Sequence, residues 1–440
     1  MAEQRGKGNG LDDTSIVPFA LPKDYMGFKI KYHPDFDNIL GCVASQHFGL
    51  VGDGKALFYE TTVREGFGEY TESLHPEINQ EKTQDSGNSR SEDLLSHGIR
   101  RCKKEQPGLK TVSHFCTKDC IFDFDWLRIS QSSVSESYGL HASFAIGCGD
   151  GSVQLGRFYP KKPGKTMDVL KVYSRHKKEI STVACWDNLL ASGSWDGQCF
   201  VHNIQRQDPI VQLHASTGVV NRVLWNTNRQ TSNNAIPQLL TASGDGSVLL
   251  WDLRLRASSR FDAGAGEKSS LATTPQQTIK VLGGEVLSVA SNPVQNFEIA
   301  TGCVDGAIRV FDIRKLQTYK NGEEVKSGWS VPVDLVHVHD LGVRDLEFQN
   351  SFTKTPLLLS ASYDMTVALL DLQKEDPLLD HFEHHSEFVY GVATSKKNMA
   401  IGFLLFIVWL YSNQVSWCHS HDSRFASCAW DETLAIVDFK

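Results

Sequence analysis

An aspartate in a tight-turn setting, followed by a short apolar run, recurs along this chain. The clearest copies read Leu-Ala-Ser-Gly-Ser-Trp-Asp-Gly at 190–197, Leu-Thr-Ala-Ser-Gly-Asp-Gly at 240–246 and Ile-Ala-Thr-Gly-Cys-Val-Asp-Gly at 299–306. Self-similarity of this kind predicts a chain built from repeated supersecondary units that stack on one another. The aspartates that mark the copies are Asp53, Asp150, Asp196, Asp245, Asp305, Asp364 and Asp431.

The copies resemble WD repeats, in which roughly 40 to 45 residues form one four-stranded propeller blade. Such a blade is pinned by the turn Asp, a Ser or Thr four residues earlier, an aromatic six residues later and an upstream His, so that buried polar groups stay paired. We therefore predict an all-β fold, a seven-bladed WD-repeat β-propeller with long disordered loop insertions. The predicted blade-network residues are His176, Ser192, Asp196, His214, Thr241, Asp245, Trp251, Thr301, Asp305, His339, Ser360, Asp364, Ser427 and Asp431.

The Ser, His and Asp sets have the composition of a hydrolase triad. The same trio recurs in several blades, however, which indicates a structural role. The sequence contains no Gly-rich phosphate loop, no His-Glu metal helix and no nucleophile elbow in a strand-to-helix context. Its ten cysteines fit no zinc spacing, and we interpret them as reduced core thiols. The chain is thus predicted to be no enzyme and to need no metal or other cofactor.

The chain of 440 residues is longer than seven blades require, since seven copies take about 300 residues. The propeller is assigned to 23–440, with insertions at about 64–110, 256–278, 317–328 and 398–421. The first insertion is polar and buries too little apolar surface to order itself, so we predict a mobile loop there. Residues 1–22 form an N-terminal segment that is a candidate for the outer strand closing the last blade. They lack the apolar core of a secretory signal, so we expect a cytosolic protein.

The last insertion contains an unbroken apolar run, Ala400–Tyr411, between strands of the final blade. A bilayer span takes about 20 apolar residues, and the polar residues 412–414 end this run well short of that length. Three interpretations stay open. The run is a buried insert, a contact to a membrane or partner, or a translated stretch, such as an intron, that the real protein lacks.

The formal net charge is −8, and the basic run at 100–104 stands alone. Nucleic acid is therefore not an expected partner. An acidic propeller favours a basic partner, and the mouth of its channel is a concave site with a polar rim. Composition alone predicts a peptide-binding or scaffolding propeller.

Four segments go beyond a generic WD repeat: Met26–Pro34, Ala44–Gly49, Glu383–Phe388 and Cys428–Thr433. They resemble the corresponding stretches of the peroxisomal receptors for type-2 targeting signals, and the resemblance runs from about Tyr25 to Phe439 outside the insertions. The second repeat departs from the pattern, because it has no Trp-Asp ending.

That family implies capture of newly made matrix enzymes, such as thiolase, through an N-terminal nonapeptide. The signal has Arg or Lys, an aliphatic residue, five variable residues, His or Gln, and a second aliphatic residue. The family also implies a co-receptor, a docking complex, and cycling between the cytoplasm and the peroxisome without stable membrane insertion.

On a helix, the first and last pairs of the signal lie on one face about two turns apart. Blade geometry places the residue before each turn Asp, and the residues that enter each innermost strand, at the top of the ring. Ile121, Phe122 and Arg344 are among the latter, and Gln46 and His47 belong to the family's first-blade motif. We predict that the signal's cation meets the acidic residues Asp119, Glu179, Glu285 and Glu387, and that Trp195, Tyr363, Phe388 and Trp430 make apolar contacts.

Other functions would use the same fold. A generic scaffold or ubiquitin-ligase substrate receptor would bind at the rim or at 64–110. A histone-binding propeller would have an added N-terminal helix, which residues 1–22 do not resemble. A methylesterase would need an acid–base set in the channel. In the structural alternative, the aromatics only pack on neighbouring blades and the Glu side chains are solvated.

Overall fold

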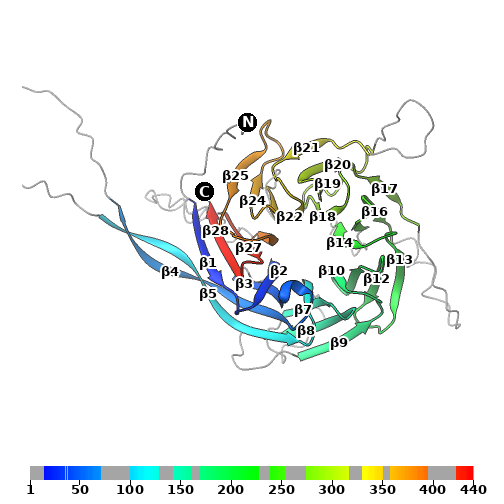
Figure 1. The fold of residues 1–440 in the computed structure, drawn as a ribbon, viewed down its shortest axis with the longest axis horizontal. Helices are drawn as coiled ribbons and strands as arrows, with labels where there is room; N and C mark the ends of the chain where they lie inside the picture. Colours follow the sequence, from blue (N-terminus) through cyan, green and yellow to red (C-terminus); the bar gives the residue numbers. More distant parts are fainter. Residues whose placement is uncertain are drawn as a thin grey trace, which may run out of the picture.

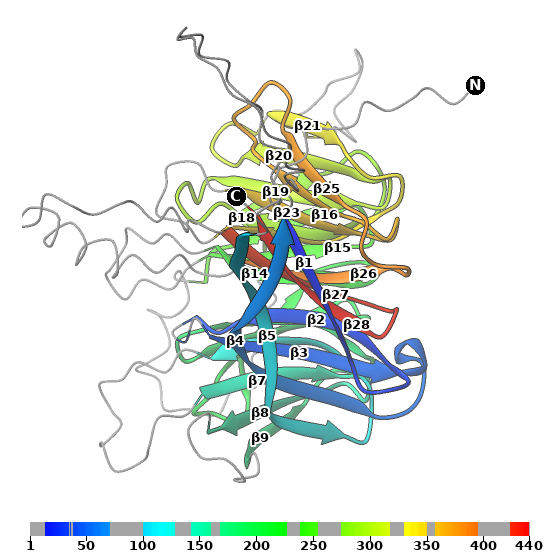
Figure 2. The ribbon, with the colours of Figure 1, turned by 90° about the vertical axis from the view of Figure 1, so that its left-hand side faces the viewer.

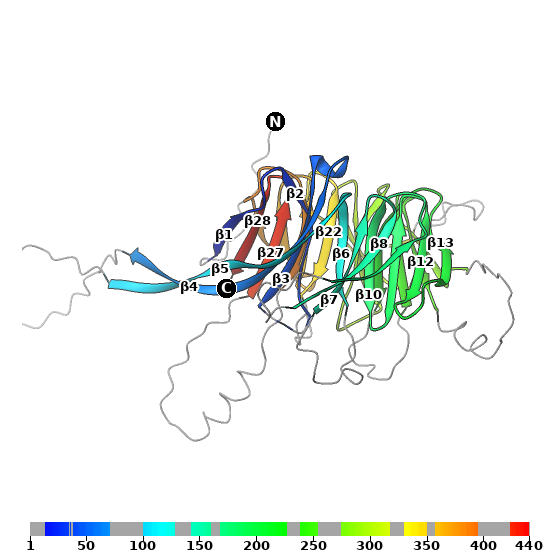
Figure 3. The same cartoon turned by 90° about the horizontal axis from the view of Figure 1, so that it is seen from below.

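The computed structural model describes residues 14–34, 36, 38–70, 100–127, 142–159, 168–226, 238–253, 274–316, 330–349, 357–394 and 423–439, without the side chains of 63–70, 100–107, 394 and 423. These residues form seven four-stranded antiparallel sheets. Figure 1 shows the sheets as blades around a central axis, and Figure 3 shows the ring from its side. The predicted seven-bladed propeller is confirmed.

The blades follow the chain in order, each running from an innermost to an outermost strand. The first holds β2 (Tyr25–Tyr32), β3 (Ile39–Gln46), β4 (Gly54–Tyr70) and β5 (Arg100–Thr117), with a short 3-10 turn, η1 (His47–Gly49). The second holds β6 (Ile121–Leu127), β7 (Ala142–Cys148), β8 (Ser152–Phe158) and β9 (Asp168–Ser174), and the third β10 (Ile180–Trp186), β11 (Leu189–Ser194), β12 (Gln198–Asn203) and β13 (Pro209–His214).

The fourth blade holds β14 (Val220–Asn226), β15 (Gln238–Ser243), β16 (Ser247–Trp251) and β17 (Gln277–Lys280), and the fifth β18 (Val286–Ser291), β19 (Glu298–Cys303), β20 (Ala307–Asp312) and β21 (Asp334–His337). The sixth holds β22 (Val343–Phe348), β23 (Leu358–Ser362), β24 (Val367–Leu370) and β25 (Leu378–Phe382). The seventh holds β26 (Val389–Thr394), β27 (Ser423–Ala429), β28 (Thr433–Phe439) and β1 (Ser15–Ala20).

The seventh blade joins the two ends of the described chain. β1 pairs with β28 in antiparallel register, from Ser15 opposite Asp438 to Ala20 opposite Thr433. Figure 1 shows these strands side by side, β1 in blue and β28 in red. Backbone hydrogen bonds between the first and last strands thereby close the ring, so the blade has the same four strands as its neighbours.

The inner strands are covered on both faces, which explains their continuous apolar runs. Every residue of β7 is buried, whereas β9, at the edge of the same blade, has only Tyr173 buried. Between the first two blades, the Phe58 ring lies 4.9 Å from the rings of Phe144 and Phe158. Each such ring stabilises the fold by roughly 1.5–3 kcal/mol through burial.

The prediction of a loop from residue 64 is wrong at both of its ends. β4 runs on to Tyr70 and β5 begins at Arg100, so the two strands pair far beyond the blade, from Thr61 opposite Leu109 to Tyr70 opposite Arg100. Figures 1 and 2 show this two-stranded ribbon, blue and cyan, leaving the ring. A polar ribbon satisfies its backbone hydrogen bonds by strand pairing, without burying apolar surface, so its composition does not reveal it.

The other insertions fall mostly outside the described residues. β17 begins at Gln277, so the insertion predicted at 256–278 ends before that strand. The ranges 317–328 and 398–421, with the apolar run 400–411, lie wholly outside. β26 and β27 nevertheless pair directly across the last one. In the described part of the chain, no helix has the length and apolar character needed to cross a membrane.

The cysteines whose side chains the structure describes are free thiols, most of them in the core. Cys42, Cys120, Cys148, Cys199, Cys303 and Cys428 are free and buried, Cys185 is half-buried and Cys116 is exposed. Burial raises the pKa of the Cys148 thiol to about 12, which keeps it protonated. Most of the described cysteines therefore act as small apolar core residues, as predicted.

His202 in β12 predicts an acid sensitivity. It is buried against Tyr173, and neither ring nitrogen has a hydrogen-bond partner among the described residues. Burial lowers the pKa of His202 to about 4. An unfolded His takes up its proton near pH 6.5. The stability contributed by the neutral folded ring is therefore complete above about pH 6.5 and is lost as the pH falls toward 4.

We expect the melting temperature of the wild type to fall more steeply between pH 7 and pH 4.5 than that of His202→Phe. A series of thermal melts across this range measures the difference. Parallel curves for the two proteins would contradict the assignment.

Candidate site at the channel mouth

Every innermost strand carries a β-bulge at the same place in its blade. A bulge leaves one residue unpaired and re-aims its side chain. Because the register shift recurs, the unpaired residues form one layer around the channel. We name this layer the mouth ring: Phe28, Phe122, Ser181, Asn221, Leu287, Arg344 and Tyr390.

An arc of aromatic side chains follows the mouth ring across five blades. Its ring centroids are separated by 5.7 Å from Trp195 to Phe122, 5.6 Å from Phe122 to Phe28 and 5.0 Å from Phe28 to Tyr390. Tyr390 stacks on Trp430 at 4.7 Å with an interplanar angle of 14°. The arc continues from Trp430 to Phe388 at 5.5 Å and from Phe388 to Tyr363 at 5.2 Å. We name these seven residues the aromatic belt.

The belt contains all four aromatics that the sequence selects, Trp195, Tyr363, Phe388 and Trp430. Backbone hydrogen bonds explain why they share one end of the ring. The amide of Trp195 donates to the carbonyl of Glu179 at 3.1 Å, and that of Trp430 donates to Phe388 at 3.1 Å. The residue before the turn Asp is thus fastened to the residue that enters the innermost strand of its own blade.

The four predicted acidic residues come from the second, third, fifth and seventh blades, so they are spread around the mouth. Glu179 and Glu285 occupy equivalent positions, since the carbonyl of Glu285 accepts from Val304 as that of Glu179 accepts from Trp195. The Glu285 carboxylate also accepts a hydrogen bond from Asn221 at 2.9 Å. Asp119 accepts from the amide of Cys120 at 2.7 Å, and Glu387 is exposed.

Glu179 and Trp195 share a shallow hollow at the boundary of the second and third blades. Its volume is about 480 Å³, and its lining residues are Gly149, Asp150, Lys177, Lys178, Glu179 and Trp195. Trp195 is 40% exposed, so part of its indole ring is open to solvent. The hollow is thus lined by two acidic residues, Asp150 and Glu179, and two basic residues, Lys177 and Lys178, beside the partly exposed Trp195 ring. A carboxylate together with an aromatic face is a combination that suits a cationic side chain.

The first-blade motif builds a raised loop beside the belt. The amide of Asp53 donates to the side chain of Gln46 at 3.0 Å, and His47 and Phe48 have positive φ angles of 47° and 58°. Phe48 is 47% exposed and its ring lies 5.1 Å from Trp430. Counted from the bulge of β2, Gln46 stands where the other blades have the turn Asp, whereas Asp53, counted from β4, keeps the turn-Asp position directly before Gly54. Sequence inspection did not select Phe28, Tyr390 or Phe48 for the site.

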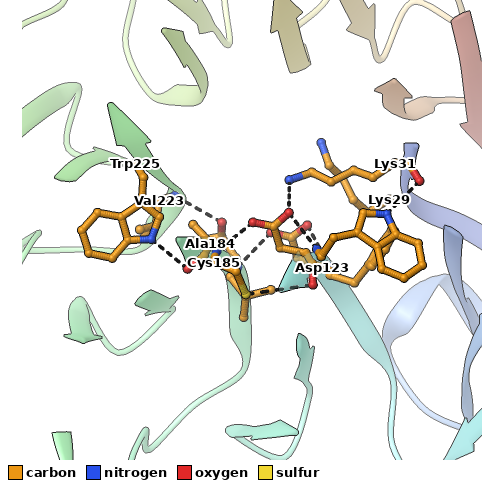
Figure 4. A network of polar contacts seen from close by, with 12 residues as sticks. Lys29, Lys31, Asp123, Ala184, Cys185, Val223 and Trp225 are labelled. Atoms are coloured by element: carbon orange, nitrogen blue, oxygen red, sulfur yellow. Dashed lines mark hydrogen bonds and ion pairs between the residues drawn. The ribbon is translucent and has the colours of Figure 1, made fainter. Parts of the chain in front are cut away.

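Directly after each bulge comes a second set of equivalent residues, which we name the brace ring. The Arg222 guanidinium lies 3.4 Å from Asp123 and 3.6 Å from Asp345, and the Lys29 ammonium pairs with Asp345. Figure 4 shows Lys29 and Asp123 in this network, with Lys31 beside them. The members of the brace ring are Lys29, Asp123, Thr182, Arg222, Ser288, Asp345 and Gly391.

The brace carboxylates also fasten neighbouring blades. Asp123 accepts from the amide of Val183 at 2.9 Å, and Asp345 accepts from Val392 at 3.2 Å. Burial alone would raise the pKa of Asp345, but Lys29 and Arg222 hold it below its ordinary value. Two cations and two anions thus neutralise one another inside the channel, below the mouth ring.

Three blades contain the predicted His network. The His176 ring bonds Ser192 at 2.9 Å and Asp196 at 3.2 Å. His339 bonds Ser360 and Asp364 at 2.8 and 3.0 Å, and His385 bonds Ser427 and Asp431 at 2.9 and 3.0 Å. The serines are fully buried, so no substrate reaches their hydroxyl groups. Their role in these blades is structural.

The assignment of His214 is wrong. His214 ends β13, is exposed and bonds Gln198 at 2.9 Å. The network histidines stand four residues before the innermost strand, and in the fourth blade that position is Ser216, whose hydroxyl donates to Asp245 at 3.2 Å. The other predicted contact is confirmed, since the Trp251 indole donates to Thr241 at 3.1 Å.

The fifth blade replaces the histidine with an arginine. Arg309 donates to both carboxylate oxygens of Asp305, at 3.1 and 2.6 Å, and its carbonyl accepts from Thr301 at 3.2 Å. A Cβ at Gly283 would lie 2.3 Å from Asp305 and 2.8 Å from Arg309. The glycine therefore leaves the space that this ion pair occupies.

The second blade lacks the Trp-Asp ending and obtains an aromatic side chain from a different position. Gly156 stands six residues after the turn Asp, where the first, fourth and fifth copies have Tyr59, Trp251 and Phe311. Its partner across the strands is Phe144, and a Cβ at Gly156 would lie 2.2 Å from the Phe144 ring. The aromatic group is thus supplied by the adjacent strand.

His381 brings a third possible metal-ligand atom near His339 and Asp364, with these atoms within 4.8 Å of one another. His339 already uses one ring nitrogen for Asp364 and the other for Ser360. A metal would have to replace those hydrogen bonds, so we assign the described group to the blade network.

Because His339 belongs to a blade network and His214 does not, we predict that replacing them changes the stability of the fold by different amounts. His339→Ala leaves Ser360 and Asp364 without their partner and is expected to cost about 1–2 kcal/mol of unfolding free energy. His214→Ala removes only an exposed contact and is expected to change it by less than about 0.5 kcal/mol. Urea denaturation of both variants measures the difference, and equal losses would contradict the correction.

The comparisons with known proteins agree with this architecture. The profile described as WD domain, G-beta repeat matches residues 167–203, 207–252 and 275–312. A Saccharomyces cerevisiae protein named peroxisomal targeting signal 2 receptor is 22% identical over 83% of this chain and 90% of its own length. The Schizosaccharomyces pombe protein of the same name is 21% identical over 94% of this chain and 96% of its own length.

A Mus musculus protein of that name is 31% identical over a shorter stretch, 23% of this chain and 24% of the mouse protein. The two fungal matches therefore cover most of the chain, well beyond the residues that the WD profile matches. This chain is a WD-repeat protein that resembles the peroxisomal targeting signal 2 receptors along most of its length.

Proposed function

We propose that this chain is a receptor for the N-terminal type-2 peroxisomal targeting signal of matrix enzymes and that it binds the signal at the mouth ring. The observation that carries the proposal is the aromatic belt, an unbroken arc of ring contacts on one end of a propeller that resembles receptors of this name over most of its length.

The signal would bind as an amphipathic helix with its aliphatic residues on the belt. Its Arg or Lys would lie in the hollow, against the Glu179 carboxylate and the exposed Trp195 ring. Asp119, Glu285 and Glu387 would add to the negative potential around the mouth, which attracts a cation over a longer distance. The brace ring would keep the mouth rigid, because its ion pairs cross the channel.

The partners in this proposal are matrix enzymes such as thiolase, a co-receptor that closes over the bound helix, and the docking complex of the peroxisome. The chain would take up its cargo in the cytosol and cycle to the peroxisome. Binding rather than catalysis is its proposed role, in keeping with the buried serines of the blade networks.

Fluorescence anisotropy tests the proposal. A labelled type-2 signal peptide is titrated with the full chain, with and without co-receptor, beside a peptide whose Arg or Lys is replaced by Glu. We expect saturable binding that the charge-reversed peptide loses and that Glu179→Lys weakens. If neither condition gives binding, the chain belongs to the generic scaffold or ubiquitin-ligase substrate receptors instead.

A further inference from the structure

Arg344 is the charged member of the mouth ring. It is the bulge residue of β22, between Val343 and Asp345, and it is half-buried. Its guanidinium carbon lies 4.8 Å from the centroid of the Tyr390 ring, which is itself 5.6 Å from the Tyr363 ring. The cation therefore lies inside the aromatic belt, on the surface that the proposed ligand would cover.

The guanidinium has no carboxylate partner in the described part of the chain. The neighbouring Asp345 is already engaged by Lys29 and Arg222. Arg344 is only half-buried, so its side chain keeps access to solvent at the mouth. Arg314 gives a useful contrast, because it also lies over an aromatic ring, Phe297 at 3.3 Å, but pairs with Asp312 at 2.7 Å.

An arginine in this setting is pre-organised to bind an anion. Contact with the Tyr390 ring limits the freedom of the side chain, so little entropy is lost when its planar donors pair with a carboxylate. A bound helix would also exclude water, which strengthens a charge-assisted hydrogen bond. A neutral ligand group would instead leave the guanidinium partly desolvated and unpaired, which is unfavourable.

We propose that Arg344 is a specificity-determining residue that pairs with a carboxylate on the bound targeting helix. This inference rests on the proposed function and deepens it. The carboxylate would come from one of the five variable positions of the signal, so Asp or Glu at that position would raise the affinity.

The test compares peptides that carry Asp or Asn at each of the five variable positions, by anisotropy with and without co-receptor. We expect one position at which the wild type binds the Asp peptide about tenfold more tightly than the Asn peptide. Arg344→Met keeps the apolar stem over Tyr390 and should abolish this preference while the Asn peptide still binds. Arg344→Lys keeps the positive charge but loses the planar pair of donors of the guanidinium. It should retain about a threefold preference for the Asp peptide over the Asn peptide.

Arg314→Met is the matched control and should leave the preference unchanged, because Arg314 follows β20 at the end of the strand opposite the mouth. Thermal melts of the variants check that each is folded. The inference is overturned if the parent peptide binds but Asp and Asn peptides do not differ, or if the difference survives in Arg344→Met. A third outcome is that Asp and Asn peptides bind equally while Arg344→Met recruits the co-receptor more weakly than the wild type. The carboxylate that pairs with Arg344 would then belong to the co-receptor, and the inference would also be overturned. Absence of binding by every peptide would instead remove the proposed function itself.

Discussion

Replacing Asp345 with alanine is expected to lower the free energy of unfolding by about 3–5 kcal/mol. The substitution leaves the buried Lys29 ammonium and the buried Arg222 guanidinium with one counter-charge, Asp123, between them. It also leaves the amide of Val392 without its acceptor, so the sixth and seventh blades lose a direct link. Removing one partner of a buried ion pair costs more than the pair contributes, because the remaining charge stays desolvated.

Urea denaturation followed by tryptophan fluorescence measures this loss. Asp312→Ala is the matched control, since Asp312 also pairs with an arginine, Arg314, but at a surface where the cation is 54% exposed. The free energy of unfolding of Asp312→Ala should be lower than that of the wild type by less than about 1 kcal/mol. Because the pKa of Asp345 is lowered in the fold, the stability it supplies is present above about pH 4 and is lost at lower pH. A loss below about 1 kcal/mol in Asp345→Ala would contradict the bracing role.

Replacing Trp430 with alanine is expected to weaken binding of the signal peptide by about 30-fold to 1000-fold, or roughly 2–4 kcal/mol. Trp430 is the best-connected ring of the belt, with contacts to Phe28, Phe48, Phe388 and Tyr390. Its removal takes away an anchor at the centre of the proposed interface and loosens the rings that remain. Isothermal titration with the peptide and co-receptor measures the affinity.

Leu335→Ala is the control for lost apolar surface. Leu335 is 47% exposed on β21, the outermost strand of the fifth blade, which contributes no ring to the belt. Its removal should leave the affinity unchanged within about twofold. Equal affinities for Trp430→Ala and the wild type, with both proteins folded, would show that the belt is a packing feature and not a binding surface.

The sequence was sufficient to predict the ring and its turns, because the period and the turn Asp are local features that each blade repeats. The same logic found Trp195, Tyr363 and Trp430, which directly precede a turn Asp, and Phe388, which directly precedes the innermost strand β26. It failed for His214, where the correct residue, Ser216, is not a histidine and lies two positions later. It also failed for Asp305, whose partner Arg309 comes from within the blade.

Two members of the mouth ring, Phe122 and Arg344, were placed at the top of the blades from the sequence, but the rest of that ring and the brace ring could not be predicted in the same way. A bulge shifts the register by one residue, and nothing in the local pattern of β22 shows that Arg344 is the residue left unpaired. The ion pair between Lys29 and Asp345 joins residues 316 positions apart, which only the closed ring brings together. The ribbon of β4 and β5 was missed because its stability comes from backbone pairing and not from apolar composition.

Photo-crosslinking tests the central claim, that the signal helix binds at the mouth ring, most directly. A type-2 signal peptide with a photoreactive group at its first aliphatic position is irradiated with the full chain and co-receptor, and the linked residues are found by mass spectrometry. The account predicts links to the aromatic belt and to the loop around Phe48, which lies 5.1 Å from Trp430. Links confined to the outer strands or to the ribbon of β4 and β5 would contradict it.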